Sequence, residues 1–163
     1  MQYFLATALM AICSFAWGDA EAATVTGTFN VQVIIAATCV LNSSTNLSFG
    51  TQGVLAAPIN DQSTITVTCT NTTPYNIGLD KGLNGGSVTT REMKGVVSAA
   101  LVNYSLFRDA PMTLNWGQTI GTDTVGASGT GSAQPFTVYG QIPAQPTPAP
   151  DTYNDTITVT VTY

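Results

Sequence analysis

The sequence predicts an all-β protein in which two sheets pack face to face. Apolar residues alternate with Thr, Ser and Asn in several short runs, the period-two pattern of half-buried strands. Clusters of Gly and Pro separate these runs, and we find no useful stretch with the 3.6-residue period of an amphipathic helix. A chain of 163 residues that is 44% hydrophobic is long and apolar enough for one domain with a core.

The predicted strands are short and regularly spaced along the chain. The first alternates from Thr24 to Ile35, and the last alternates just as regularly up to Tyr163. The strand at 101–107 is partly apolar on both faces, which favours a central position in its sheet. In chain order the predicted strands span residues 24–35, 47–50, 64–70, 75–79, 101–107, 136–142 and 156–163.

The connections have the composition of turns and loops. Residues 82–86 form a glycine-rich turn cluster, and residues 121–132 are rich in Gly, Thr and Ser, as in a flexible loop. Four prolines between residues 143 and 150 predict a stiff linker before the last strand. No internal repeat or second domain is visible, so we expect one sandwich of the immunoglobulin type.

The N-terminus has the pattern of a secretory signal peptide. Residues 3–17 are almost wholly apolar, and Ala20 and Ala22 are the small residues that a signal peptidase reads. The apolar run is shorter than the ~20 residues of a comfortable membrane span. We predict cleavage after Ala22, which removes Asp19 and Glu21 and leaves seven acidic and four basic residues. A net charge of −3 argues against nucleic acid or an anionic membrane as a partner.

Two cysteines remain after this cleavage. Cys39 and Cys69 stand alone in a chain predicted to be exported to an oxidising compartment. We therefore predict a disulfide between them. Closing a loop of this length stabilises a fold by ~3–4 kcal/mol in the chain-entropy model. Two thiolates without histidine are too few ligands for a zinc site.

The sequence contains no group of residues typical of an active site. Histidine, the commonest acid–base catalyst near neutral pH, is absent. The carboxylates are scattered, and the closest pair, Asp151 and Asp155, has the positions of turn caps rather than of calcium ligands. Lys81 and Lys94 are the lysines that could activate a serine, and neither has a supporting motif. We expect neither enzymatic activity nor a metal or small-molecule cofactor.

The regularity of the two terminal strands points to a way of binding other chains. The strand at 24–35 lacks the charges, prolines and bulges that usually protect a sheet edge. Such a segment can add as a strand to the sheet of another chain. The simpler interpretation is that outer strands of a sandwich often alternate in this way.

Six segments along the chain match the pattern of a known family. They are Val25-Thr26-Gly27, Leu47-Ser48-Phe49-Gly50, Ile65-Thr66-Val67-Thr68-Cys69, Tyr104-Ser105-Leu106-Phe107-Arg108-Asp109, Tyr139-Gly140-Gln141-Ile142-Pro143 and the stretch from Tyr153 to Tyr163. These segments resemble the spore coat protein U domain family, which includes the pilins of archaic chaperone–usher systems. The resemblance covers essentially all of residues 23–163, in the family's order, and is strongest over the last eleven residues.

The resemblance implies an immunoglobulin-like sandwich that lacks its final strand and is completed by a strand from a partner. A periplasmic chaperone would lend that strand first. An outer-membrane usher would then replace it with the N-terminal segment, residues 23–35, of the next subunit. Residues 36–163 would form the sandwich. The residues filling the neighbour's groove would be Val25, Gly27, Phe29, Val31 and Val33.

The C-terminal strand is the counterpart of this donor segment. Its apolar face, made of Ile157, Val159, Val161 and Tyr163, would pair with the chaperone, and the resemblance implies that basic side chains hold the terminal carboxylate. A simpler role for Tyr163 is to cap the core. The function implied is that of a pilus subunit carried through the periplasm to the cell surface, where it supports adhesion and biofilm formation.

Two other functions stay open. The same domain could serve as a secreted coat or matrix protein that does not polymerise. It could also be a carbohydrate-binding adhesin module that uses exposed aromatic residues such as Trp116 or Tyr75, although packing in or around the core is the interpretation we favour for Trp116.

Overall fold

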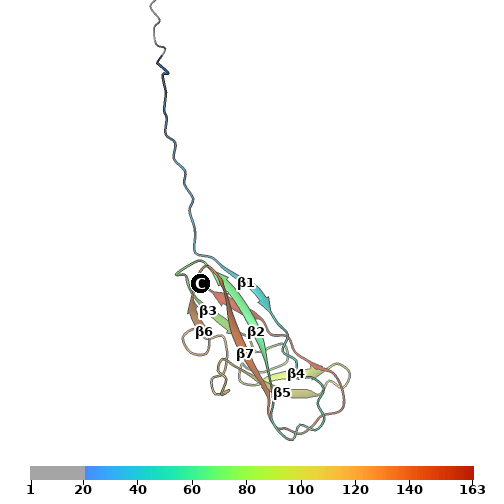
Figure 1. Cartoon of the computed structure of the whole chain (residues 1–163). Coiled ribbons are helices and arrows are strands. Elements are labelled where there is room, and N and C mark those ends of the chain that lie inside the picture. Colours follow the sequence, from blue (N-terminus) through green and yellow to red (C-terminus); the bar gives the residue numbers. More distant parts are fainter. Residues whose placement is uncertain (1–20) are drawn as a thin grey trace, which may run out of the picture. The chain divides into compact units, whose positions relative to one another are not determined.

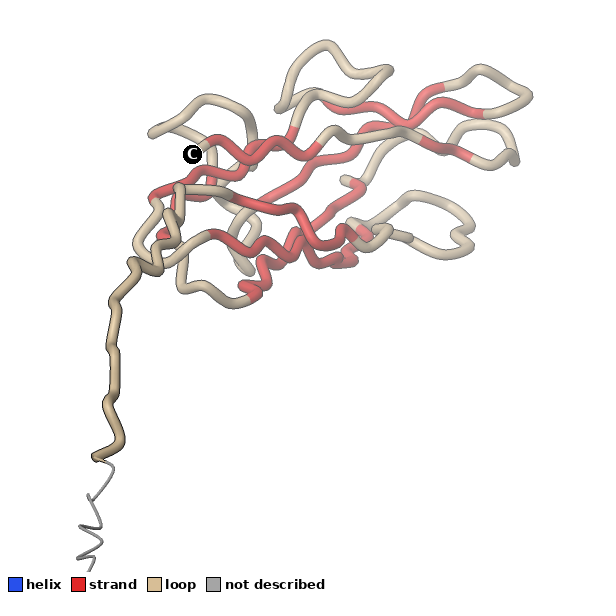
Figure 2. Tube along the Cα trace, turned by 90° about the horizontal axis from the view of Figure 1, so that it is seen from above, coloured by secondary structure: helices blue, strands red, loops and turns tan. Residues whose placement is uncertain are grey.

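The computed structural model describes residues 21–163, and in this range it contains strands, turns and loops but no helix (Figure 2). No helix in this range is therefore long and apolar enough to cross a membrane. The predicted signal peptide, apart from Glu21 and Ala22, lies outside the described residues. The strands are β1 (Cys39–Ser44), β2 (Ile59–Cys69), β3 (Pro74–Leu79), β4 (Arg91–Gly95), β5 (Leu101–Phe107), β6 (Val125–Ser128), β7 (Ala133–Ile142), β8 (Tyr153–Asn154) and β9 (Val159–Thr162).

Residues 35–163 form a compact body of two antiparallel sheets. The larger sheet has the order β1-β2-β7-β5-β4-β8, and the smaller has the order β6-β3-β9 (Figure 1). The long strands β2 and β7 pair over ten residues from Ile59 to Thr68 and connect the two ends of the larger sheet. Within this body the C-terminus lies at the end that holds β3 and β6, and β4 and β5 lie at the opposite end. The predicted immunoglobulin-like sandwich is confirmed.

The N-terminal segment differs from its predicted structure. Residues 21–34 belong to a separate unit and form no strand, although the alternation predicted one from Thr24 to Ile35. Their side chains are exposed; Val25 is 99% exposed and Phe29 86%. A strand exists only when its backbone groups pair with a neighbouring strand, and the alternation specifies the faces of a strand without supplying that neighbour.

Other element boundaries also differ from the prediction. Residues 47–50 form no strand, and the predicted flexible loop at 121–132 contains β6. The last predicted strand, residues 156–163, is shortened to β9, and the two-residue strand β8, which was not predicted, precedes it. Strands β1 and β4 were not predicted, because polar residues occupy both faces in Asn42–Ser44 and in Arg91–Lys94. Pairing within the sheet overrides such weak local patterns.

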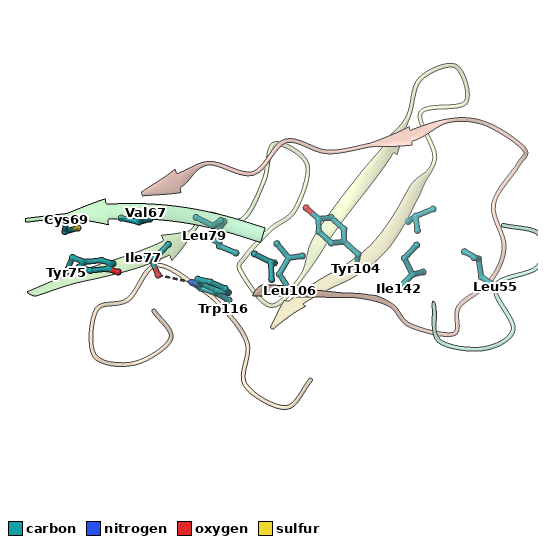
Figure 3. Packing of buried hydrophobic residues seen from close by; sticks show 13 residues of the cluster. Leu55, Val67, Cys69, Tyr75, Ile77, Leu79, Tyr104, Leu106, Trp116 and Ile142 are labelled. Atoms are coloured by element: carbon teal, nitrogen blue, oxygen red, sulfur yellow. Dashed lines mark hydrogen bonds between the residues drawn. The ribbon is translucent and has the colours of Figure 1, made fainter. Parts of the chain in front are cut away.

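The core lies between the sheets and is built from the inward faces of β2, β3, β5 and β7 (Figure 3). Trp116, on the loop after β5, is 1% exposed, and its indole Nε1 donates to the Ile77 carbonyl at 2.8 Å. Tyr75 is equally buried and packs edge-on against Phe136. The prediction that Trp116 packs in the core is confirmed.

A disulfide joins the edge strand β1 to its neighbour β2. Cys39 and Cys69 are direct partners in the β1–β2 register, and their sulfur atoms are bonded, as predicted. The Cys69 side chain is fully buried, so the disulfide also fills part of the core. It fixes β1, which is an edge strand of its sheet, to the better-supported β2.

A buried arginine on β4 connects the end of β3 to two neighbouring loops. Arg91 is 0% exposed, and its guanidinium donates four hydrogen bonds to backbone carbonyls. The acceptors are the carbonyls of Leu79, Asp80, Val88 and Trp116, at 2.7 to 3.0 Å. Burial lowers the Arg91 pKa, against the opposing influence of the Tyr104 hydroxyl and the surrounding carboxylates. The planar five-donor group thus replaces hydrogen bonds that these chain segments do not make to one another.

We predict that the protein isolated from an oxidising compartment contains no free thiol. The reason is that Cys39 and Cys69 are bonded and both remain after the predicted cleavage. Mass spectrometry after thiol alkylation without reductant should show no adduct, and reduction first should give two. Two alkylated cysteines in the unreduced sample would contradict the pairing.

We predict that Arg91→Ala destabilises the domain by at least about 3 kcal/mol, because a buried carbonyl left without a donor costs ~1–3 kcal/mol and four lose theirs. Lys94→Ala removes an exposed cation from the same strand and is the matched control, expected to change stability by less than about 0.5 kcal/mol. Urea unfolding measures both. Equal effects would show that charge, and not the carbonyl contacts, matters at position 91.

Candidate functional site

A groove of about 510 Å³ opens between the two sheets on one side of the body. Its floor is apolar and belongs to the core, with Ile65, Leu79, Leu106 and Val138 among its residues. One wall is the chain from Ser44 to Phe49, which follows β1. The other wall is the chain from Tyr153 to Val159, which runs from β8 into β9. The groove therefore lies over the core along the C-terminal segment from Tyr153 to Val159.

Both walls are continuations of edge strands. Among the described strands, β9 pairs with β3 alone, and β1 pairs with β2 alone. The edge of β9 away from β3 and the chain after β1 have no strand between them. An edge strand presents unpaired N–H and C=O groups, and an apolar groove beside it presents unburied side chains. Together they form a site with the backbone groups and the apolar groove that an additional strand would need.

The wall formed by residues 44–49 depends on a glycine in the neighbouring sheet. Leu47 and Phe49 are half-buried and pack over Gly140 of β7. A Cβ atom at position 140 would lie 2.5 Å from Leu47 Cδ1 and 3.1 Å from Phe49 Cζ. These two side chains can cover the sheet because Gly140 has no side chain, and they close the groove from the side opposite β9.

Hydrogen bonds accepted by two carboxylates hold the C-terminal wall in place. The Asp80 carboxylate accepts hydrogen bonds from the backbone amides of Gly82 and Thr158. The Asp155 carboxylate accepts hydrogen bonds from the Leu83 amide and, at 2.6 Å, from the Tyr104 hydroxyl. These contacts fix the backbone on either side of Ile157, so the apolar residues of the wall face the groove.

The environment of these groups shifts their pKa values. Burial acts to raise the pKa of Asp80, but the Thr158 and Gly82 hydrogen bonds and the Arg91 charge outweigh it and lower that pKa. Burial, together with the hydrogen bond to Asp155, raises the pKa of Tyr104 well above its usual value. Tyr104 therefore stays a neutral donor at physiological pH, and the groove wall keeps its hydrogen bonds.

The predicted residues of the C-terminal strand lie where the alternation placed them, with one exception. Ile157, Val159 and Val161 are half-buried and alternate with exposed threonines. Ile157 and Val159 line the groove, and Val161 packs against the core beside it. Tyr163 is 60% exposed and does not cap the core.

The predicted donor residues are exposed in the N-terminal unit. Phe29 and Val31 are each 86% exposed, and Val33 is 81% exposed. Gly27 has open space around the position of a Cβ atom. None of these residues takes part in a strand in the single chain, so their role as donors stays a prediction.

The alternative of sugar binding through Trp116 or Tyr75 is wrong for these two residues, since both are buried. In residues 21–163 no group of three or more His, Cys, Asp or Glu side chains could hold a metal ion. Asp151 and Asp155 cap turns, as predicted, but they do so on loops distant in sequence.

Sequence reasoning missed the polar residues that position the groove. Arg91 and Asp80 belong to no motif, and Tyr104 was noted only as part of a segment that resembles the family; the partners of Arg91 and Asp80 are backbone groups. The one signal in the sequence that could have drawn attention to Arg91 is the scarcity of basic residues, since the chain has only four.

Comparison with known proteins identifies relatives over the whole body and the N-terminal segment. The family model of the Spore Coat Protein U domain matches residues 25–160. Protein U of Myxococcus xanthus is 30% identical over 162 aligned residues, which cover 91% of this chain and 90% of that protein.

Two solved structures are also similar. One is the CsuC–CsuE chaperone–tip adhesion subunit pre-assembly complex from the archaic chaperone–usher Csu pili of Acinetobacter baumannii, with a TM-score of 0.56, 24% identity and 79% of this chain covered. The other is a chaperone–tip adhesin complex described as vital for activation of CFA/I fimbriae biogenesis, with a TM-score of 0.48, 14% identity and 77% covered. This chain spans 40% and 41% of the respective solved chains.

The solved complex of the Csu pili shares the sandwich fold with this chain, and the family model and Protein U match it over nearly its full length. The chain belongs to the spore coat protein U domain family.

Proposed function

We propose that this protein is a structural subunit of a surface pilus assembled by a chaperone–usher pathway. The observation that carries the proposal is the groove between β9 and residues 44–49, which has the apolar floor and open strand edge of a sandwich lacking one strand. The N-terminal segment of a neighbouring copy supplies that strand. A pilus is the assembly that results when every copy donates its segment to the next.

The orientation of the donated strand follows from the sheets. Every strand pair in the described body is antiparallel, and antiparallel pairs are slightly more stable per residue than parallel ones. The donor therefore runs antiparallel to β9. Its first residues lie beside Val161, and Val33 lies near Tyr153.

The register of the donor is set by its alternation. Val25, Gly27, Phe29, Val31 and Val33 face the groove, and Thr24, Thr26, Thr28, Asn30 and Gln32 face water. A slip by one residue would turn the polar set inward. Burying Phe29 contributes about 1.5–3 kcal/mol of transfer free energy, in addition to the hydrogen bonds made along β9.

A periplasmic chaperone protects the groove before assembly. Its strand pairs with the same free edge of β9, beside Ile157 and Val159, and an outer-membrane usher exchanges that strand for the donor segment. The protein acts by assembly and not by catalysis, passes through the periplasm to the cell surface, and there supports adhesion and biofilm formation. The similarity to a chaperone–subunit complex of archaic pili supports this route by fold.

A non-polymerising coat protein is the second candidate. It is favoured by the match to Protein U, which covers 90% of that protein, whereas the match to the Csu complex covers 40% of the solved chain. A coat protein that functions as separate copies would have to be stable with its groove open or filled from its own chain.

We predict that the isolated chain from Ala23 to Tyr163 aggregates or unfolds readily, and that a copy of residues 23–35 fused after Tyr163 through a flexible linker restores a stable monomer. Val31→Asp in the fused copy should abolish the rescue, because it places a charge in an apolar groove. Gln32→Asp in the same copy faces water and should leave the rescue intact. Chromatography and thermal unfolding distinguish these outcomes. A stable monomer without the fused copy would favour the coat protein.

We also predict that the cognate chaperone co-purifies with the unfused chain and not with the stable fusion. The reason is that the fused strand occupies the β9 edge that the chaperone needs. The fusion carrying Val31→Asp should bind the chaperone again. Equal capture of all three proteins would show that the chaperone recognises another surface.

A further inference from the structure

The turn between β4 and β5 is an exposed apolar surface that the groove does not use. At its tip Val96 is 68% exposed and Val97 87%. The turn lies next to one end of the groove, since Gly95 pairs with Tyr153, and Tyr153 lines the groove. In Figure 1 this is the end of the body away from the C-terminus.

The turn is held rigidly, in contrast to many exposed apolar loops. The Asp151 carboxylate accepts hydrogen bonds from the amides of Val97 and Ser98 and from the Ser98 hydroxyl, at 2.7 to 2.9 Å. The Val96 amide donates to the Thr152 carbonyl, and the Gly95 amide to the Ala100 carbonyl. The same hydrogen bonds lower the pKa of Asp151 to about 2, so the carboxylate is ionised throughout the physiological range. Both valines are therefore presented in a fixed position.

The chain connection determines what lies beside this turn in an assembled fibre. A donor strand antiparallel to β9 leaves the groove at the Tyr153 end, after Val33. Five residues, 34–38, then lead to Cys39, the first residue of β1 in the next copy. Even fully extended, five residues span only ~17 Å. The start of the next copy is consequently confined to the neighbourhood of the 95–98 turn.

The start of that next copy is apolar as well. Ile34, Ile35 and Val40 are each more than half exposed, and Ala36 and Ala37 lie between them. No lysine, arginine, aspartate or glutamate occurs from residue 22 to residue 60, so no charge opposes the approach of two apolar surfaces. Burial of both surfaces would remove apolar area from water at each junction.

We infer that the turn at residues 95–98 is a docking surface for the next copy of the chain, with Val96 and Val97 packed against residues 34–40 where the donated segment leaves the groove. This contact rests on the proposed function. It restrains the angle between successive subunits, beyond the attachment that the donated strand provides.

The test uses fibres assembled from the full chain with Val97→Lys combined with either Ala37→Glu or Val40→Glu. A zero-length carbodiimide cross-linker joins a lysine amine and a carboxylate only when the two are in contact. We expect a ladder of covalent oligomers on a denaturing gel from at least one pair, with a cross-link at position 97 identified by mass spectrometry. Ile120→Lys with the same glutamates is the matched control, because Ile120 is also exposed but lies over the outer face of the smaller sheet.

A second measurement does not depend on the introduced glutamates. Val97→Lys alone should lower the temperature at which fibres dissociate, and Ile120→Lys should not. Fibres with neither a cross-link at position 97 above the wild-type background nor a change in dissociation temperature would overturn the contact and leave the strand exchange standing. A wild-type chain that forms no fibres with its chaperone and usher would overturn the contact and the proposed function together.

Discussion

The structure depends on an unpaired strand edge beside an open hydrophobic groove. β9 has a neighbouring strand on one side only, and on the other side a groove lies over the core residues Leu79, Leu106 and Val138. A sandwich normally closes such a gap, because unpaired backbone groups and exposed apolar side chains both cost free energy. A fold that keeps the gap open is stable only to the extent that something else fills it.

The rest of the body is built to keep this gap in shape while it is empty. The disulfide holds β1 on one side, and Asp80, Asp155 and Tyr104 hold the chain before β9 on the other. Arg91 ties the supporting loops together through backbone carbonyls. These are directional contacts, and they do not require the groove itself to be packed. The polar network therefore fixes the chain at the rim of the groove, as hydrophobic packing fixes the strands in the centre of the body.

The sequence was informative wherever local pattern and tertiary environment agree. The alternation of Ile157, Val159 and Val161 with threonines correctly gave their faces, and the pair of lone cysteines gave the disulfide. The strand at 101–107 was predicted with its observed bounds, and it has the predicted central position, between β7 and β4, with Val102, Tyr104 and Leu106 on its buried face. The two-sheet architecture followed from many such strands and from the absence of helical periodicity.

The incorrect strand predictions have a common cause. Strand pairing and long-range hydrogen bonds cannot be recognised in a short window of sequence. β4 is a strand because β5 and β8 flank it, although Arg91, Glu92 and Lys94 give it no apolar face. The segment from Thr24 to Ile35 has the better pattern and yet forms no strand, since no neighbour pairs with it in the single chain. The alternation in a segment shows which side chains it could bury, and pairing with a neighbouring strand determines whether it buries them. In the proposed function, the two segments with the clearest alternation, residues 24–35 and residues 156–163, are the donor and the acceptor, and each supplies the strand edge that the other lacks.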